Sequence, residues 1–134
     1  MPEHQISEMM RSYLDALLAR GDFASYFDDD VTFEIVGTTQ AARGRQAVRD
    51  VISWLHTQAF DATAKVKTLI ADEGQAALEA EFIGTHTGEF LGMAPTGKSV
   101  NVPYCVVYDV PADKITALRI YMPMELFSQQ LGNG

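Results

Sequence analysis

Several residue types that place a protein in a particular class are scarce in this sequence. Cys105 is the only cysteine, so no disulfide can form within the chain, which argues against a disulfide-stapled secreted scaffold. Ten lysines and arginines stand against 18 acids, which gives a net charge of −8. Because a duplex-binding protein needs clustered basic residues to neutralise phosphates, nucleic acid is not an expected partner. The same net charge is repelled by an anionic membrane surface.

Long apolar runs are missing as well. Charged residues interrupt the N-terminal segment, where a signal peptide needs an unbroken apolar core. No segment approaches the roughly 18 apolar residues of a membrane span. We therefore expect a cytoplasmic protein with no membrane partner.

The patterns that hold metals and phosphates are also absent. The histidines His4, His56 and His86 have no spacing that presents two ligands on one face, so the sequence predicts no zinc site. The glycines between Gly84 and Gly97 are too widely spaced for a phosphate-binding loop. No metal and no cofactor are expected.

The composition itself is that of a globular protein, with 47% hydrophobic and 21% charged residues among 134. This length suits one domain, residues 1–134. Apolar residues recur at helical spacing from Ile6 to Leu18, and Gly21 ends this helix. Next come a short helix over 23–27, a polar turn over 28–30, a strand over 31–36 and a helix over 44–58.

After Phe60 the pattern changes from helical spacing to alternation. It predicts strands over 64–70, 76–87, 100–110 and 115–122, and then a closing helix from Pro123 to Leu131. Gly84 and Gly88 indicate bulges and strong curvature. Helices followed by a run of antiparallel strands predict an α+β fold.

One strand, from Val100 to Tyr108, is apolar at nearly every position. Strands of this kind are covered on both faces. Helices can cover one face, but a chain this short has little left to cover the other. We therefore predict a homodimer, in which a second copy packs against the outer face of the sheet.

A glycine-containing segment from Phe82 to Gly92, followed by Pro95 to Lys98, resembles the signature of SnoaL-like polyketide cyclases. The likeness extends over essentially the whole chain. It implies a strongly curved antiparallel sheet wrapped around the N-terminal helices, with a cone-shaped pocket inside. The wider superfamily, which is nuclear transport factor 2-like, also holds ketosteroid isomerase, epoxide hydrolases and non-catalytic binders, so the fold does not define the activity.

The resemblance also carries site residues over, position by position. In cyclases and epoxide hydrolases the last strand supplies an aspartate as general acid/base, and this position is Ile120 here. The neighbours that face inward with it are Leu118 and Met122. Isoleucine cannot move a proton, so the standard mechanism of these relatives lacks its central group.

Ketosteroid isomerase offers a second comparison. Its general base corresponds to Glu34, and the tyrosine of its oxyanion hole lies one residue from Tyr13. The aspartate of that hole corresponds to Cys105, which is a weak hydrogen-bond donor. The isomerase machinery is therefore half present.

Each catalytic candidate has a structural alternative. Glu34 either faces the cone, where desolvation raises its pKa toward that of a useful base, or points to water. His86 shares the parity of the buried positions of its strand, so it is either a proton shuttle or a core residue. The Tyr13 hydroxyl bonds either a ligand or a neighbouring protein group.

The hypothesis drawn from these residues is cofactor-free, isomerase- or cyclase-like proton transfer on a hydrophobic carbonyl compound. Glu34 is its base, and His86 or Tyr13 polarises the carbonyl. Its alternatives are a pocket that binds a small hydrophobic molecule without catalysis, and a protein-interaction module. The expected lining of the pocket consists of Trp54, Phe82, Tyr104, Leu118, Ile120 and Met122.

Overall fold

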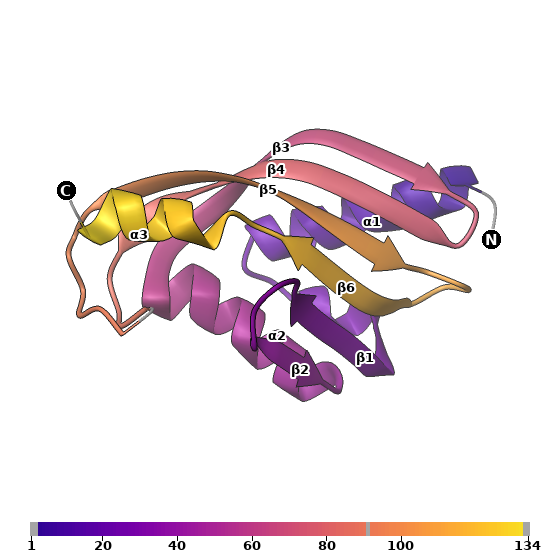
Figure 1. Cartoon of the computed structure of the whole chain (residues 1–134). Helices are drawn as coiled ribbons and strands as arrows, with labels where there is room; N and C mark the ends of the chain where they lie inside the picture. Colours follow the sequence, from indigo (N-terminus) through magenta and orange to yellow (C-terminus); the bar gives the residue numbers. More distant parts are fainter. Residues whose placement is uncertain (1–2, 91, 133–134) are drawn as a thin grey trace.

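A six-stranded sheet and three α-helices form the protein, whose computed structural model describes residues 3–90 and 92–132 (Figure 1). The α-helices are α1 (Glu3–Leu18), α2 (Arg45–Trp54) and α3 (Met124–Gly132). A 3₁₀ helix, η1 (Phe23–Tyr26), follows α1, and a π-helix, η2 (Leu55–Ala59), continues α2. The strands are β1 (Phe27–Ile35), β2 (Ala41–Arg43), β3 (Phe60–Asp72), β4 (Gln75–His86), β5 (Ser99–Asp109) and β6 (Ile115–Tyr121).

The sheet has the strand order β2-β1-β6-β5-β4-β3. Four of its neighbouring pairs are antiparallel, but β1 and β6 run parallel, which corrects the expectation of a purely antiparallel sheet. Hairpins force only neighbours in sequence to run antiparallel, whereas β1 and β6 are joined by the long segment that holds α2 and four strands. The α+β class and the curved sheet are confirmed.

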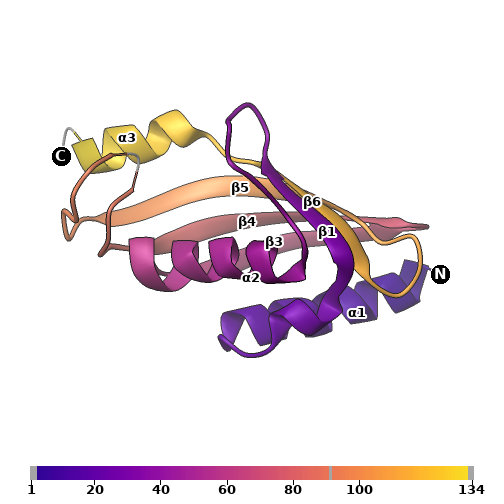
Figure 2. The ribbon, with the colours of Figure 1, turned by 90° about the horizontal axis from the view of Figure 1, so that it is seen from below.

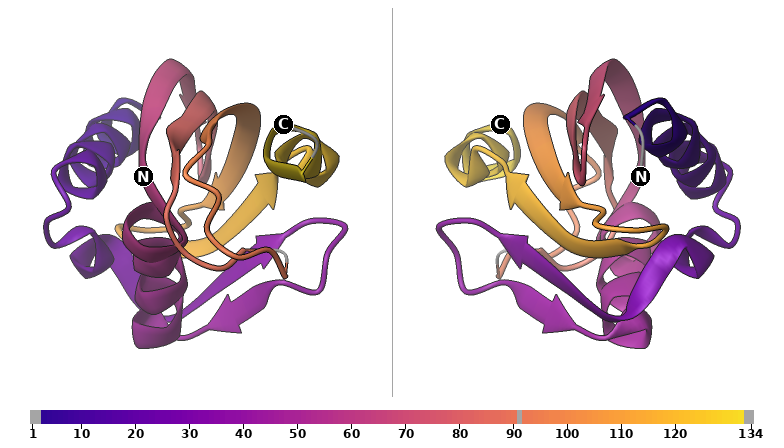
Figure 3. Two further views of the ribbon diagram at one scale, coloured as in Figure 1. Left: turned by 90° about the vertical axis from the view of Figure 1, so that its left-hand side faces the viewer. Right: turned by 90° about the vertical axis from the view of Figure 1, so that its right-hand side faces the viewer.

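The helices α1 and α2 cover the concave face of the sheet (Figure 2). Viewed end-on, the sheet bends around α2 (Figure 3). In the same view α3 lies beside β5, on the side away from α1. Alternate residues of β4 and β5 point inward and are buried against the two helices. On α2, the stripe of Val48 and Ile52 is buried in the same core.

A second, aromatic core lies beneath α3. The rings of Phe60, Phe82, Phe90 and Phe127 pack there in edge-to-face pairs and one tilted pair, with centroids 4.9 to 5.7 Å apart. Tyr104, Met122 and Met124 pack against both cores and connect them.

The bulge of the long hairpin lies at a different place from the predicted one. The register shifts between Val66 and Thr68 in β3, whereas Gly84 pairs regularly with Ala62. Gly84 is needed because a Cβ at that position would lie 2.6 Å from the Cβ of Ala62. Gly88 is packed as closely against the backbone of Gln58. Both glycines therefore permit close approach of the chain, and neither marks a bulge.

The predicted polar turn over 28–30 was wrong, because these residues belong to β1. Arg45 supports this segment from the start of α2, donating from Nε and Nη2 to the carbonyl oxygen of Phe27. Its guanidinium also lies 2.7 Å from a carboxylate oxygen of Asp29. An arginine distant in sequence thus stabilises three adjacent acids in an extended conformation.

Only one face of β5 is covered within the chain. Val100, Val102, Val106 and Tyr108 are buried, while Asn101 and Pro103 are exposed on the opposite face. Cys105 and Val107 on that outer face are half-buried. None of the helices in the described residues combines the length and the hydropathy needed to cross a membrane.

Candidate ligand-binding site

Three tyrosines and one histidine surround a small cavity between α1, α2 and the inner face of the sheet. This space, here called the tyrosine cavity, measures about 50 Å³, which is room for about three or four water molecules. Its polar lining consists of Tyr13, His56, Tyr104 and Tyr108. The rest of the lining is apolar and comprises Leu17, Ile52, Leu78, Val106, Leu118 and Ile120.

The tyrosine hydroxyls of this cavity are hydrogen-bond donors without protein partners. Within residues 3–90 and 92–132, no hydrogen bond forms to the hydroxyl of Tyr13, Tyr104 or Tyr108. Burial raises the pKa of Tyr104 to about 12 and lifts the pKa values of Tyr13 and Tyr108 as well. All three hydroxyls therefore keep their protons at neutral pH.

The surroundings of His56 determine which of its ring nitrogens carries the proton. Its Nδ1 lies 2.9 Å from the carbonyl oxygen of Ile52, and because a carbonyl can only accept, Nδ1 carries the proton. Burial lowers the pKa of His56, so the ring is neutral at pH 7. Its Nε2 then holds a free lone pair, and this atom is buried without a partner among the described residues.

The backbone brings His56 to this position through a change of helix type. Val48, Ile52 and His56 follow one another at four-residue spacing, and the chain passes from α2 into the π-helix η2 at Leu55. π-helical turns are rare and are frequently found at functional sites. The sequence interpretation considered His56 only as a metal ligand, although its spacing from Ile52 already placed it on the buried stripe.

Of the expected lining residues, Tyr104, Leu118 and Ile120 meet Tyr13 in the tyrosine cavity. Ile120 therefore faces inward, as the resemblance implied. Cys105, which corresponds to the isomerase aspartate, lies on the outer face of β5. Its neighbour Tyr104 takes the inward position, since successive residues of a strand alternate between the two faces.

The other expected lining residues lie elsewhere. Trp54 lines a separate apolar cavity of about 230 Å³ with Phe33, Ile35 and Phe90. Phe82 is buried in the aromatic core, where its ring touches Phe60, His56 and Phe127. Met122 is half-buried between the two cores.

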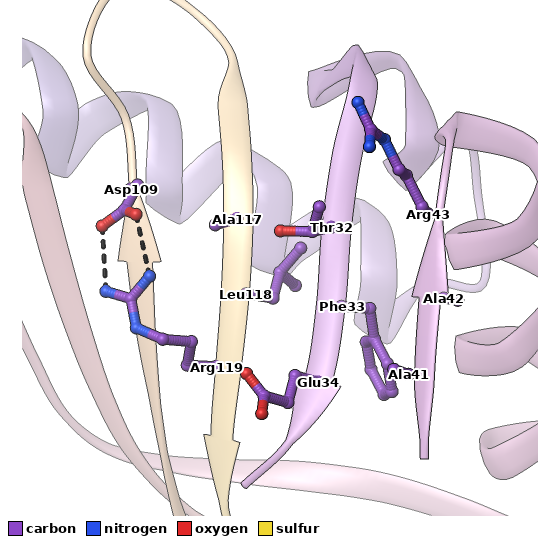
Figure 4. A pocket seen from close by; sticks show the side chains of 10 residues that line it. All are labelled: Thr32, Phe33, Glu34, Ala41, Ala42, Arg43, Asp109, Ala117, Leu118 and Arg119. Atoms are coloured by element: carbon purple, nitrogen blue, oxygen red, sulfur yellow. Dashed lines mark hydrogen bonds and ion pairs between the residues drawn. The ribbon is translucent and has the colours of Figure 1, made fainter. Parts of the chain in front are cut away.

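Glu34 does not face the cone. It is exposed on the outer face of β1, where its Cα is paired with that of Arg119 on β6 (Figure 4). Phe33 and Ile35 take the inward positions, which is the alternative orientation considered for this strand. Without desolvation in the cone, Glu34 loses the physical reason to act there as a base.

The outer face beside Glu34 forms an open hollow of about 650 Å³. Arg119 donates to both carboxylate oxygens of Asp109 there, over 2.8 and 2.9 Å (Figure 4). These bonds lower the pKa of Asp109 and raise that of Arg119. The hollow is wide and open, and its lining combines the Arg119–Asp109 ion pair, Glu34 and Arg43 with apolar side chains.

His86 is fully buried, as expected, but it lies outside the tyrosine cavity. Its Nδ1 accepts a hydrogen bond from the backbone N–H of Thr96 over 3.2 Å, and its own backbone bonds to Gly97 and Lys98. His86 therefore anchors the loop that follows β4. Leu91 of this loop lies outside the described residues, and no cluster of metal-ligating side chains occurs among those described.

The fold and the cavity together define an α+β cone with a cavity inside it. The family model of SnoaL-like polyketide cyclases matches residues 8–130, so the chain belongs to this family. A comparison with curated protein sequences finds no match.

Solved structures agree on the fold. A candidate SnoaL-like polyketide cyclase from Jannaschia sp. CCS1 superposes with a TM-score of 0.87 at 17% identity, covering 98% of this chain and 94% of the other. An epoxide hydrolase of the LEH-like type from M. tuberculosis has a TM-score of 0.76 at 19% identity, covering 98% and 92%. A candidate ketosteroid isomerase from Kribbella flavida superposes with a TM-score of 0.70 at 20% identity, covering 90% of this chain and 79% of the other.

The lowered pKa of His56 predicts a loss of stability in acid. The unfolded chain takes up a proton near pH 6.5, before the folded chain does, so the stabilisation is complete above that pH and falls as the pH drops below it. The slope contributed by this one group is at most about 1.4 kcal/mol per pH unit. We expect urea unfolding of His56→Leu to depend less on pH between 7.5 and 5 than that of the wild type. Equal pH dependence in both proteins would contradict this.

Proposed function

We propose that the protein binds a small, largely apolar molecule that carries a hydroxyl or enol group, and that it does so in the tyrosine cavity. The observation that carries the proposal is the free lone pair of Nε2 in His56, buried beside tyrosine hydroxyls that have no protein partner. Buried polar atoms are normally hydrogen-bonded, and a site that leaves one unsatisfied suits a ligand that completes the bond.

The chemistry of the lining favours one class of ligand. Nε2 of His56 accepts a hydrogen bond, and the tyrosines donate, so a ligand oxygen that both donates and accepts matches the two together. The surrounding Leu78, Val106, Leu118 and Ile120 favour an apolar body. A phenol or an enol meets both requirements.

The low basicity of His56 favours a binding function over proton transfer. A general base works best with a pKa near the operating pH, whereas burial lowers the pKa of His56. The inward acid of the family is replaced by Ile120, and Glu34 lies on the outer face. The cavity thus holds donors and an acceptor for an oxygen atom, but only a weak base.

The proposal predicts that phenol binds more tightly than toluene, which has a similar shape but no hydroxyl. One hydrogen bond contributes about 1 kcal/mol, so we expect about a fivefold difference in Kd. An NMR titration of the tyrosine ring and Ile120 methyl signals measures both constants. His56→Leu should reduce the difference, because it removes one of the groups that bond the hydroxyl.

The matched control is Tyr121→Phe, which removes a hydroxyl from the outer face and should leave phenol binding unchanged. Tyr13→Phe removes a hydroxyl from the cavity and should weaken phenol binding without affecting toluene. If toluene binds as tightly as phenol, or if neither ligand shifts the cavity signals, the proposal is wrong.

We also propose that the protein forms a homodimer through the outer face of the sheet. Ile70, Ala77 and Val107 are paired in register across β3, β4 and β5 and form an apolar row on this face. Ile70 is 60% exposed, and Tyr121 on β6 is 48% exposed. Large exposed apolar side chains gathered on one face are typical of association surfaces.

Sedimentation tests the dimer directly. At micromolar concentration the protein should have twice the 14.8 kDa mass of one chain. Val107→Glu should produce the monomer, because it places a charge within the apolar row. Ser12→Glu adds the same charge on an exposed position of α1 and should leave the dimer intact. A wild-type protein with the mass of one chain would exclude the dimer.

A further inference from the structure

A second space adjoins the tyrosine cavity and opens between the end of α1 and α2. This space, here called the α1–α2 cleft, measures about 130 Å³. Leu17, Ile52 and His56 line both the cleft and the tyrosine cavity, so these three side chains form the partition between them. The outer part of the cleft is lined by the exposed residues Arg20, Arg49 and Thr57.

The cleft gathers basic side chains in a protein whose overall charge is negative. The chain has a net charge of −8, yet two guanidinium groups line the cleft and none of its lining residues is acidic. The hydroxyl-bearing side chains of Ser53 and Thr57 complete the polar part of the wall. The cleft thus presents two guanidinium groups, which are ion-paired with the exposed Asp61 and Asp50. Guanidinium groups are suited to bind a small anion.

Arg20 is held in the cleft in an unusual conformation. Its φ of 56° is the only positive value of a non-glycine residue within the described chain, although Gly21 is the adjacent residue. At the C-terminal end of a helix this left-handed conformation normally falls to glycine. The backbone N–H groups of Arg20 and Gly21 donate to the carbonyl oxygens of Leu17 and Ala16, so this conformation closes the end of α1 with the Arg20 side chain lining the cleft.

The contacts of Arg20 show what this conformation achieves. Nη2 of Arg20 donates to a carboxylate oxygen of Asp61 over 2.6 Å and lies 3.4 Å from the carbonyl oxygen of His56. The guanidinium is thereby positioned against the π-helix that carries His56. Three irregular features, namely the left-handed Arg20, the π-helix and the unpartnered Nε2, meet around this one cleft.

We propose that the α1–α2 cleft is the subsite for a carboxylate group, and that the ligand is an amphipathic acid whose apolar part enters the tyrosine cavity. This inference rests on the proposed function, because it assigns the second end of the same ligand. The carboxylate lies between Arg20 and Arg49, and the apolar part passes the partition formed by Leu17 and His56.

The existing ion pairs of the two arginines do not block such a ligand. Arg20 and Asp61 are half-exposed or more, and the same holds for Arg49 and Asp50. Exposed pairs contribute little to stability and are screened by salt. A carboxylate in the cleft adds to these contacts or replaces them at small cost, and it gains hydrogen bonds to charged donors.

Benzoate and benzamide test the subsite, because they share a shape and differ in charge. We expect benzoate to bind the wild type at least tenfold more tightly than benzamide at low salt, in an NMR titration of the cavity signals. Arg49→Gln should remove most of this difference. Because Arg49 is exposed, its replacement should leave the fold intact. Arg20→Gln should have the same effect. Arg11→Gln removes the same charge from an exposed position of α1 outside the cleft and should have no effect.

A second readout is the pKa of His56, which the nearby charge of Arg20 helps to lower. Bound benzoate should raise this pKa, and bound benzamide should not. Equal binding of the two probes, or a benzoate preference that survives both Arg20→Gln and Arg49→Gln, would overturn the carboxylate subsite. Phenol binding would still support the tyrosine cavity in that case, whereas failure of phenol, benzoate and benzamide together would overturn both proposals.

Discussion

The hydrogen bond from Nδ1 of His56 to the carbonyl oxygen of Ile52 determines the chemistry of the pocket. It places the single ring proton on the side that faces the helix, so Nε2 is left as an acceptor. With the opposite tautomer, the ring would present a fourth donor, and only the tyrosine hydroxyl oxygens would be left to accept a bond from a ligand. One contact over 2.9 Å therefore gives the cavity an acceptor that is not a hydroxyl.

The fold positions this contact by the curvature of its sheet and by the change of helix type after Trp54. β4, β5 and β6 bring Leu78, Tyr104 and Ile120 to the concave face, and α1 brings Tyr13 from the opposite side. The π-helix then places His56 between the tyrosine cavity and the α1–α2 cleft. The result is an apolar space with polar groups at one end and two arginines beyond the partition.

The sequence pattern predicted the elements well and the orientation of single side chains less well. Periodicity located α1, α2 and the four long strands, because one buried face leaves a strong signal in each. Strand alternation could not decide whether Glu34 or its neighbours face inward, because apolar residues stand both before and after Glu34 in the sequence. The parallel pairing of β1 with β6 depends on contacts between the two ends of the chain, which no local pattern records.

The site was only partly predictable for related reasons. The inward positions of Tyr13, Tyr104 and Ile120 follow from helical spacing and from the family resemblance. His56 was missed because its importance comes from a tautomer and an unfilled hydrogen bond, which only the three-dimensional contacts define. Arg20 gave no signal in the sequence, because a left-handed conformation is expected at Gly21 beside it.

The most direct test of this account is the tautomer of His56, observed by long-range ¹H–¹⁵N correlation NMR of the histidine side chains at pH 7.5. The signals of the ring should show a neutral imidazole with the proton on Nδ1 and an unprotonated Nε2 that shifts when phenol is added. His56→Leu identifies the signals by their loss. A ring protonated on Nε2, or charged at this pH, would contradict the account.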